Sequence, residues 1–412
     1  MTKKASTPAL RFKGFTYTWE QRRLGEVLSL IKDGTHGTHQ DVEDGPLLLS
    51  AKNIKHGEIR WDNTDRRIAQ ADYEKIHSTF SLENGDILLT IVGSIGEVAI
   101  LRNSDGITFQ RSVAFLRPNK ELKSEFLYAE VLSEHFQKEL DNRKSTSAQP
   151  GIYLGDLGEI PFTFPKDIAE QKQIGTYFRN LDRLITLHQR KYDKLTNMKK
   201  SMLEKMFPKN GANVPEIRFK GFTDAWEQRK LGEAVQEVTR NDATSDAPIM
   251  MITANNGFIE QSERYAFNNA GESLKKYILL EKGELAYNHG ASKLRPYGSC
   301  FTLTTSENAR IPFVYHCFSA DEQNSEFLSI ELNGADVENQ LRRIVSSGAR
   351  MDGLLNISFQ EYVSVSVLLP TIEEQNKIAD FFKNLDNLIT LHQRELEKLK
   401  NFKKACLEKM FV

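Results

Sequence analysis

A stretch of 38 residues occurs twice in this sequence, and it limits the folds that the chain can adopt. The copies run from Glu170 to Phe207 and from Glu374 to Phe411, and 24 of the 38 positions are identical at an offset of 204 residues. Both copies contain the string Leu-Ile-Thr-Leu-His-Gln-Arg. Because so long a segment is repeated nearly intact, each copy is expected to form the same single element.

Apolar residues in each copy recur at alternating intervals of four and three, which is the spacing of a coiled-coil helix. A helix of this length spans roughly 57 Å at about 1.5 Å per residue. Two such stripes of equal length in one chain are expected to bury each other, with the helices antiparallel. The expected seam residues are Ile174, Phe178, Leu181, Ile185 and His188 in the first copy and Ile378, Phe382, Leu385, Ile389 and His392 in the second.

Signals at the ends of the copies support these helices. Asp167 and Thr371 each lie three residues before a glutamate, Glu170 or Glu374, which predicts a capping box at each start. Pro208 is expected to end the first helix. The two seam histidines are interpreted as a polar pair that sets the register, in preference to metal ligands or a catalytic base.

A second repeat shows that the whole chain is a tandem duplication. Residues 11–26 recur as residues 218–233, with 13 of 16 positions identical. We call these the leading segments and expect their aromatic and leucine side chains to pack against the neighbouring domain. The chain is therefore expected to divide into a first domain, a first long helix, a second domain and a second long helix. Their ranges are 1–165, 166–208, 209–369 and 370–412.

The two domains share little sequence, yet both contain short apolar runs bounded by Gly, Asp and Asn, which predict strands. The expected strands cover residues 47–50, 87–92, 97–101, 112–117, 249–253, 284–287, 311–318 and 362–369. One helix is expected near 124–141 and its counterpart near 325–343. The predicted fold is α+β: two similar domains separated by two long antiparallel helices, as a pseudo-two-fold tandem repeat. Nearly intact helices beside divergent loops favour two related ligands over simple drift.

Composition indicates a soluble cytoplasmic protein. The chain has three cysteines and no Cys-x-x-Cys pair, which fits a reducing compartment. The first residues carry no apolar run, and the most apolar segment, 87–101, is interrupted by two glycines and a glutamate, so no membrane span is expected. The net charge is only −1, which taken alone argues weakly against a polyanionic partner.

Several kinds of chemistry are excluded by the absence of their motifs. The sequence has no Gly-Lys dipeptide and no Gly-x-Gly, so neither a Walker A loop nor a dinucleotide-binding turn is present. His36 and His39 are three residues apart, but no Cys or second His pair has ligand spacing, so no metal site is expected. We expect no catalytic residue in this chain.

Residues that read base edges and phosphates cluster on loops of both domains. Asn and Gln can pair with adenine, and Arg and Lys with guanine, while Gly-Ser and Ser-Lys turns present amides to phosphates. The candidates in the first domain are Lys32, Thr35, His36, Thr38, His39, Lys52, Asn53, Lys55, Gly93, Ser94, Gln110 and Arg111. Those in the second are Arg240, Asn241, Asn255, Asn256, Asn288, His289, Ser292, Lys293, Arg342 and Arg343.

Together these features resemble the specificity subunit of type I restriction–modification enzymes. The resemblance rests on the duplicated Trp-Glu-Gln-Arg-(Arg/Lys)-Leu-Gly-Glu, on Asp33-Gly-Thr-His36, on residues 85–96 and on the Pro-x4-Glu-Gln before the first long helix, which becomes Pro-x3-Glu-Gln before the second. It covers essentially the whole chain. The second domain departs from the pattern, since it lacks Asp-Gly-Thr-His around 238–248 and has His289-Gly-Ala-Ser292 in place of Gly-Ser-Ile-Gly.

The resemblance implies that each domain reads one half of a bipartite site in double-stranded DNA, while the helices set the spacer. It also implies two docked methyltransferase subunits that bind S-adenosylmethionine. A nuclease/translocase subunit that uses ATP and Mg would join them for cleavage, and this chain would bind no cofactor. Two alternatives remain at this point: a coiled-coil scaffold whose domains bind proteins, and a stand-alone nuclease.

Overall fold

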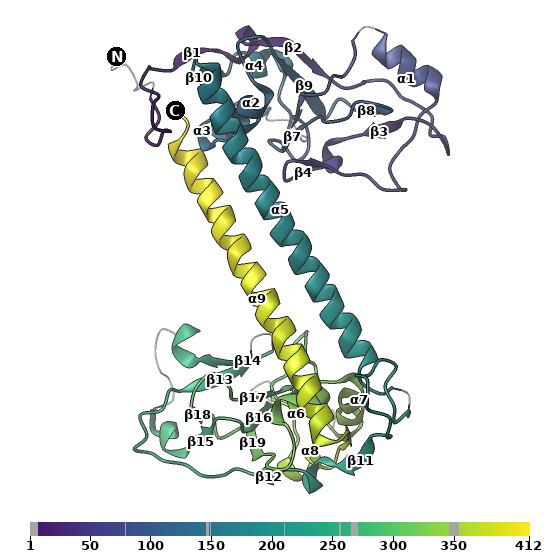
Figure 1. Ribbon diagram of the computed structural model, residues 1–412, viewed down its shortest axis with the longest axis vertical. Helices are drawn as coiled ribbons and strands as arrows, with labels where there is room; N and C mark the ends of the chain where they lie inside the picture. The colour runs from purple at the N-terminus through teal and green to yellow at the C-terminus, as the bar shows by residue number, and fades with distance from the viewer. Residues whose placement is uncertain are drawn as a thin grey trace. The chain divides into compact units, whose positions relative to one another are not determined.

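The computed structural model describes residues 7–78, 80–145, 148, 150–209, 211–254, 257–264, 271–345 and 354–412 (Figure 1). The chain divides into two compact units. The first comprises Met1–Lys191 and His392–Val412, and the second comprises Tyr192–Leu391. Each unit therefore contains one globular domain together with one end of each long helix.

The first domain is built on a four-stranded antiparallel sheet in the order β2-β9-β6-β7. Its strands are β1 (Glu20–Arg23), β2 (Leu28–Asp33), β3 (Leu47–Leu49), β4 (Ile54–Lys55), β5 (Glu58–Ile59), β6 (Ile87–Thr90), β7 (Val98–Ile100), β8 (Ile107–Phe109), β9 (Val113–Pro118) and β10 (Pro161–Phe164). Its helices are α1 (Gln70–His77), α2 (Ser124–Val131), α3 (Glu134–Asn142) and α4 (Leu154–Gly158).

This sheet is buried on both faces, which explains the unbroken apolar runs in its central strands. Successive side chains of a strand point to opposite faces. Ile87 and Leu89 of β6 belong to the core that includes α2 and α3, whereas Leu88 belongs to the core that includes β3 and β8. The strand pair β3–β8 is parallel.

The second domain repeats this frame, with a four-stranded antiparallel sheet in the order β12-β19-β16-β17. Its strands are β11 (Glu227–Lys230), β12 (Gln236–Glu237), β13 (Met250–Thr253), β14 (Gly257–Glu260), β15 (Ile278–Glu281), β16 (Leu285–Asn288), β17 (Ser299–Thr302), β18 (Asn308–Ile311), β19 (His316–Ser319) and β20 (Ser366–Leu369). Its helices are α6 (Ser325–Leu332), α7 (Ala335–Ile344) and α8 (Phe359–Tyr362). Outside the shared sheet the domains differ, since β18 pairs antiparallel with β15.

The long helices are α5 (Ile168–Lys205) and α9 (Ile372–Lys409), each of 38 residues. In the first unit Tyr177 Oη lies 3.4 Å from Cys406 Sγ, and Lys403 Nζ donates to Asp182 Oδ1 at 2.6 Å. In the second unit Lys199 Nζ donates to an Asp386 oxygen. A ring contact between Phe207, just after α5, and Phe382 adds a second pair in that unit. In both units the residue number along one helix increases as that of its partner on the other decreases, so the helices are antiparallel within each unit. All ten expected seam residues are buried or half-buried, and the predicted α+β fold with two long helices is confirmed.

Two expected helices are each split in two. The segment near 124–141 forms α2 and α3, because Ser133 ends one and caps the other: its Oγ accepts the Phe136 N–H at 3.2 Å. The segment near 325–343 forms α6 and α7, and Asn333 and Gly334 separate them. The single-helix predictions for both segments are therefore wrong, since polar and glycine residues at the break stop the helix.

Two expected strands are also shorter or interrupted. Residues 311–318 form the end of β18 and the start of β19, with Pro312 in the turn between them. Residues 362–369 begin at the last residue of α8, and only Ser366–Leu369 form a strand. An apolar run alone did not reveal these turns, because the turn residues Val314 and Tyr315 are themselves apolar.

The leading segments hold the starts of the long helices. Arg11 donates two hydrogen bonds to Glu170, at 2.6 and 2.7 Å, and Trp19 Nε1 donates to the same carboxylate at 3.3 Å. The second unit repeats this contact, with Arg218 donating to Glu374 at 2.7 Å twice. The predicted capping box is thus corrected, because both glutamates are buried and bound to arginine instead of folding back on the helix start.

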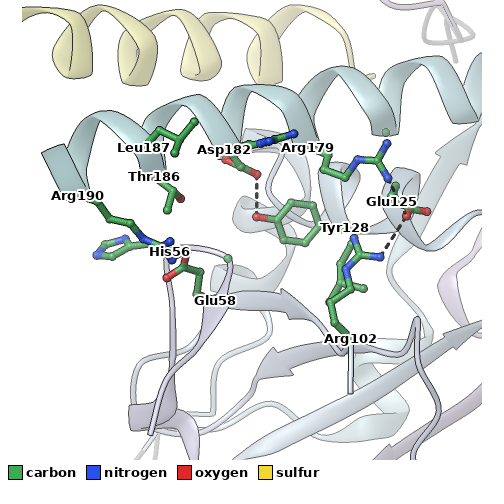
Figure 2. A pocket seen from close by; sticks show the side chains of 14 residues that line it. His56, Glu58, Arg102, Glu125, Tyr128, Arg179, Asp182, Thr186, Leu187 and Arg190 are labelled. Carbon is green, nitrogen blue, oxygen red and sulfur yellow. Dashed lines mark hydrogen bonds and ion pairs between the residues drawn. The ribbon is translucent and has the colours of Figure 1, made fainter. Parts of the chain in front are cut away.

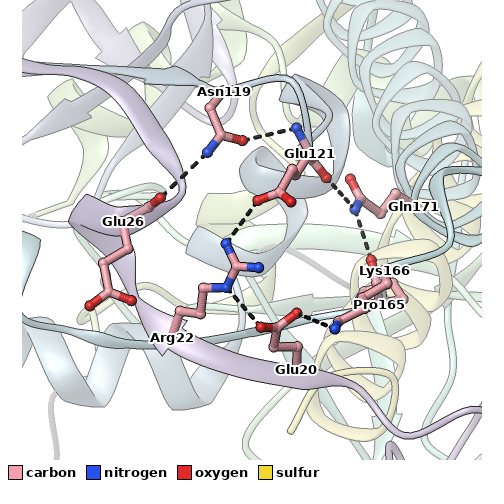
Figure 3. Close-up of polar contacts among 8 residues, drawn as sticks. All are labelled: Glu20, Arg22, Glu26, Asn119, Glu121, Pro165, Lys166 and Gln171. Atoms are coloured by element: carbon pink, nitrogen blue, oxygen red, sulfur yellow. Dashed lines mark hydrogen bonds and ion pairs between the residues drawn. The ribbon is translucent and has the colours of Figure 1, made fainter.

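Further polar contacts fasten the start of α5 to the first domain (Figure 3). Gln171 Nε2 donates to the carbonyl oxygens of Glu121 and Pro165, both at 2.8 Å. Arg22 of β1 bridges Glu20 and Glu121, with 2.8 Å to each. In the Pro-x4-Glu-Gln motif at the start of α5, Glu170 therefore binds the leading segment and Gln171 binds the domain.

The residue directly before each leading segment contacts the end of a long helix. Leu10 N–H donates to Lys409 O at 2.8 Å, and Ile217 N–H donates to Lys205 O at 2.8 Å. The first leading segment therefore joins the start of α5 to the end of α9, and the second joins the start of α9 to the end of α5. This contact satisfies a carbonyl oxygen that a helix end leaves without an intrahelical donor.

Candidate nucleic-acid interface

Three of the candidate loops in the first domain are hydrogen-bonded to one another. Thr35 N–H donates to Phe109 O at 2.9 Å, and Arg111 N–H donates to Thr35 O at 3.1 Å. Ala51 N–H donates to Ser112 Oγ at 3.1 Å. The loops at residues 34–39, 50–53 and 110–112 therefore form one surface at the ends of β2, β3 and β8, which we call the first loop cluster.

Gly34 makes this convergence possible. A Cβ atom at this position would lie 2.1 Å from Phe109 O and 2.4 Å from Gln110 O. Any side chain here would push the loop away from residues 109–110. The glycine of the Asp-Gly-Thr-His motif is therefore a packing requirement that places the two following candidates, Thr35 and His36, in the cluster.

Four candidates in the first loop cluster are exposed: His36, Thr38, Lys52 and Arg111. His36 Nε2 lies 2.6 Å from Asp33 Oδ2. Within the described residues, the Arg111 guanidinium has neither a hydrogen-bond acceptor nor a carboxylate partner. Its paired N–H groups are therefore available for a two-bond contact of the kind that reads guanine.

Other candidates in this cluster serve the loops themselves. Lys32 Nζ lies 4.3 Å from the centre of the Phe80 ring, and Thr35 Oγ1 lies 2.9 Å from His39 Nε2. Asn53 is buried, and its amide binds Ser50 N–H and Arg60 O, each at 2.9 Å. We therefore assign Asn53 to the internal structure of the loop instead of a base contact.

A buried carboxylate fixes the position of Lys52. Asp65 accepts from Asn53 Nδ2 at 2.9 Å and from Lys52 Nζ at 2.7 Å. The hydrogen bond from Asn53, followed by that from Lys52, lowers the pKa of Asp65 to about 2. Asp65 is therefore ionised at neutral pH and holds the lysine at the edge of the cluster.

The remaining candidates of the first domain lie on turns. Gly93 and Ser94 are exposed in the turn after β6, where Thr90 Oγ1 donates to Ser94 O. Lys55 is exposed in the β4–β5 hairpin, and Gln110 is half-buried beside Thr35. Exposed backbone at Gly93 and Ser94 is suited to a phosphate contact.

In the second domain, the histidine and one asparagine of the Asn-His-Gly-Ala-Ser stretch are structural. His289 is buried, and its two ring nitrogens each lie 2.7 Å from a backbone oxygen, of Leu355 and of Val314. Asn288 Nδ2 donates to Ile252 O at 3.0 Å, and its Oδ1 accepts Gly290 N–H at 2.9 Å. Both residues therefore hold loops in place, and we correct their assignment as base readers because their polar groups face the protein.

The second-domain candidates do not all come together. Arg240 binds Glu284 at the start of β16, whereas Asn288 ends that strand. Asn241 forms a bridge with Ile278 and is exposed. Arg240 and Asn241 are therefore separated from the loop that follows Asn288 by the length of β16.

A second loop cluster surrounds that following loop. Arg342 lies 5.6 Å from the centre of the Tyr297 ring, and Arg343 is also exposed on α7. Ser292 Oγ accepts Arg295 N–H at 3.0 Å, and Lys293 is exposed. The two remaining candidates, Asn255 and Asn256, lie outside the described residues.

The described residues include no cluster of metal ligands and no exposed thiol. No group of three or more His, Cys, Asp or Glu side chains among them could hold a metal ion. The three cysteines are buried, and burial raises the pKa of Cys300 to about 12, so this thiol is not an activated nucleophile. No helix in the described part of the chain is both long and apolar enough to cross a bilayer.

Sequence reasoning missed two kinds of ionisable residue. Glu130 of α2 and Glu331 of α6 occupy equivalent positions and are buried, and burial raises the pKa of both carboxyls. The only sequence signal for them was the shared Ser-Glu-Phe-Leu that begins each helix. Arginines of α5 that line a groove beside the first domain were also missed, because they resembled a solvated helix face.

The comparisons with known proteins show the same two-fold repeat. The sequence profile of the Type I restriction modification DNA specificity domain matches residues 17–197 and again residues 224–401. The specificity subunit of the type I restriction enzyme MjaVIII from Methanocaldococcus jannaschii is 27% identical over 192 residues, which cover 45% of this chain and 44% of that protein.

Two further comparisons extend over nearly the full length. A second protein of that organism, provisionally described as the MjaX specificity subunit of a type I restriction enzyme, is 23% identical over 94% of this chain and 92% of its own length. The crystal structure of the S subunit of a type I restriction–modification system from M. genitalium superimposes with a TM-score of 0.58 at 16% identity, covering 98% of this chain and 99% of that one. The structural likeness concerns the fold.

Proposed function

We propose that this chain selects the DNA sequence on which a methyltransferase and nuclease complex acts. The premise is that the chain belongs to the family of type I restriction–modification specificity proteins. Each domain reads one half of a bipartite site in double-stranded DNA. The chain itself catalyses no step. S-adenosylmethionine belongs to the methyltransferase subunits, and ATP and Mg belong to the nuclease/translocase subunit.

One observation carries this proposal: the two domains share a sheet and differ in the polar loops at its ends. The orders β2-β9-β6-β7 and β12-β19-β16-β17 are the same, whereas the loop after β6 exposes Gly93 and Ser94 and the loop after its equivalent β16 exposes Ser292 and Lys293. A common frame with two different sets of exposed donors is suited to two different base sequences.

The helices carry surfaces for the methyltransferase subunits. In the first unit Leu184 of α5 is 44% exposed. In the second unit the repeat-equivalent Leu388 of α9 is 42% exposed. Exposed leucines at matched positions of two helices mark a binding surface that occurs twice, which supports docking of two copies of one partner. The length of the helices then sets the spacer between the half-sites.

The test is the motif that the complex recognises. The chain is purified with its methyltransferase subunits and mixed with duplexes that contain a random central region, and bound duplexes are sequenced. A motif with two fixed halves and a spacer of constant length supports the proposal. Enrichment of no motif, or of a single uninterrupted motif, contradicts it.

The salt dependence of DNA affinity distinguishes the proposed function from the alternative of a coiled-coil scaffold that binds proteins. A chain that holds DNA through phosphates loses affinity steeply as salt rises, by a slope of roughly 0.9 per phosphate contact. A protein scaffold shows no such dependence, because it has no DNA affinity to lose. DNA affinity measured across a salt series therefore decides between them.

A further inference from the structure

A groove lies between the first domain and α5, entirely within the first unit (Figure 2). Its volume is about 390 Å³. One wall is the β4–β5 hairpin with His56 and Glu58, and the other is the side of α5 that carries Arg179, Arg183 and Arg190. Arg102, after β7, closes one end. We call it the basic groove.

Close packing fixes the walls of the basic groove. A Cβ atom on Gly175 would lie 2.5 Å from Glu125 Cβ and 2.9 Å from the Glu125 carbonyl carbon, so α5 approaches α2 as closely as a glycine allows. Tyr128 Oη donates to Asp182 at 3.0 Å, and Lys403 donates to the same carboxylate at 2.6 Å. The groove is therefore present before any ligand arrives, and its arginines stand on packed elements.

The carboxylates in the groove hold the arginines without saturating them. Glu125 lies 3.4 Å from Arg102 and 3.7 Å from Arg179, as Figure 2 shows, and both arginines are more than half exposed. Such long, exposed ion pairs contribute little free energy, so an incoming anion can replace Glu125 as the partner of either arginine.

Other arginines leave the groove with a positive excess. Arg190 lies 3.7 Å from Glu58, whose stronger partner is Arg60 at 2.6 Å. Within the part of the chain that the structure describes, Arg183 has neither an acceptor nor a carboxylate partner. The N–H groups of Arg183 are therefore available to an anion.

We propose that the basic groove binds a phosphodiester of the DNA backbone, outside the bases that the first loop cluster reads. Continuity of the chain supports this ligand, since the hairpin wall begins at Ile54, directly after Lys52 and Asn53 of the cluster. Guanidinium groups donate to phosphate oxygens in paired hydrogen bonds. This inference rests on the proposed function and extends the DNA contact from the loops to the long helix.

Free phosphate and nucleotides share the same chemistry, and the groove is less suited to them. Tyr128 is the one Phe, Tyr or Trp residue of its lining, and the ring is buried with its hydroxyl bound to Asp182. The exposed imidazole of His56 is the one ring of the lining left for a base to stack on. A backbone phosphate needs only the arginines, which fits the residues found here.

The experiment uses the chain in complex with its methyltransferase subunits and a duplex containing its bipartite site. Affinity is measured from about 50 to about 200 mM salt for the wild type, R183Q and R183K. Loss of one phosphate contact reduces the slope of log affinity against log salt by about 0.9. The affinity lost by R183Q should therefore be roughly 3.5 times larger at the low salt than at the high salt, whereas R183K, which keeps the charge, should retain the wild-type slope.

A matched control is R394Q, because Arg394 is the exposed repeat-equivalent of Arg190 on α9 and does not line the groove. It should leave the slope unchanged. The enriched sequence motif should be the same for all four proteins. Arg183 is exposed, so the melting temperature of R183Q should match the wild type.

Three results would overturn the inference. The first is an R183Q slope equal to that of the wild type. The second is an altered base preference for R183Q, which would make Arg183 a base reader. The third is saturable binding of inorganic phosphate by the wild type that R183Q abolishes while DNA affinity stays unchanged. If the wild-type complex selects no bipartite motif at all, the proposed function fails instead, so the two failures are distinguishable.

Discussion

His188 and His392 occupy the same position in the two copies of the repeated helix, and within the first unit their Nδ1 atoms lie 3.1 Å apart. The two rings meet edge to face, with their centres 5.2 Å apart. At most one of the two facing nitrogens can donate while the other accepts. A charge on both rings would place two cations in contact at the seam.

This pair predicts that acid weakens the helix contact. Partial burial, then the charge of His188 and that of Lys191, lower the pKa of His392. A histidine whose folded pKa is lowered contributes stability that is present above its unfolded value, about 6.5, and lost as pH falls. We expect the melting temperature to fall below about pH 6.5 in the wild type. In a variant with leucine at both positions this fall should be smaller. The nearby Glu395 does not account for the fall, because the pKa of its carboxyl is lowered and it titrates at lower pH. Parallel pH profiles for the two proteins would contradict the prediction.

Arg111 should determine bases in one half-site only. Replacing it with alanine removes a guanidinium that has no partner within the described residues, so folding should be unaffected. Selection from random duplexes should show relaxed preference at one position of one half-site, worth ~1–3 kcal/mol. The other half-site and the spacer should be retained. A uniform loss of affinity without a change of motif would show that Arg111 contacts a phosphate.

The buried pair of Arg11 and Glu170 should contribute strongly to stability. Among the residues that the structure describes, R11A leaves the buried Glu170 carboxylate with only Trp19 as a side-chain donor, and such loss typically costs ~3–5 kcal/mol. Denaturant unfolding of R11A is compared with that of R23A, which removes an exposed pair with Glu159. The control should lose less than ~1 kcal/mol. Equal losses in the two variants would show that burial of the pair adds nothing.

Glu331 should make the second unit less stable as pH rises. Burial raises the pKa of this carboxyl to about 7, with the Leu368 N–H acting in the opposite direction. A raised folded pKa gives stability that is fully present below about pH 4.5 and is lost as pH rises through 7. E331Q should therefore be more stable than the wild type at pH 8, by roughly 3 kcal/mol at most. Unfolding measured at pH 5 and pH 8 checks this, and a constant difference at both pH values would contradict it.

Gly175 should be intolerant of alanine despite its helical position. Alanine favours a helix by ~1 kcal/mol over glycine, but its Cβ would overlap Glu125, and overpacking typically costs ~1–3 kcal/mol. We expect G175A to be destabilised on balance and to weaken the contact of α5 with the first domain. G155A is the control, since a Cβ at Gly155 of α4 would have no neighbour within 4 Å in the described part of the chain. Equal stability of G175A and the wild type would indicate that α5 can shift without cost.

The sequence was informative where a local pattern is repeated many times. Heptad spacing between Ile174 and His188 predicted a buried stripe because each residue of a helix has a fixed direction. The two-fold plan followed from direct repetition and required no packing information. The family resemblance rested on the same repeats together with the motif that begins at Asp33.

Contacts between distant residues were not predictable. Arg11 and Glu170 are 159 residues apart, and nothing in the sequence of either segment identifies the other as its partner. Asn53 and His289 were chosen as base readers for their chemistry, but their burial depends on how separate strands close around them. The basic groove was hidden for a similar reason: a run of arginines on a helix is usually a solvated face, and only the hairpin packed beside it makes it concave.

The division of the two units across both helices has a consequence for biosynthesis. Residues 192–391 form one compact unit from a single continuous stretch of chain, so it can close as soon as it leaves the ribosome. The first unit needs His392–Val412. Until those residues are made, Cys406 cannot cover Tyr177, and the apolar stripe on the part of α5 that belongs to the first unit stays exposed. The domain that is translated first is thus the one that is completed last.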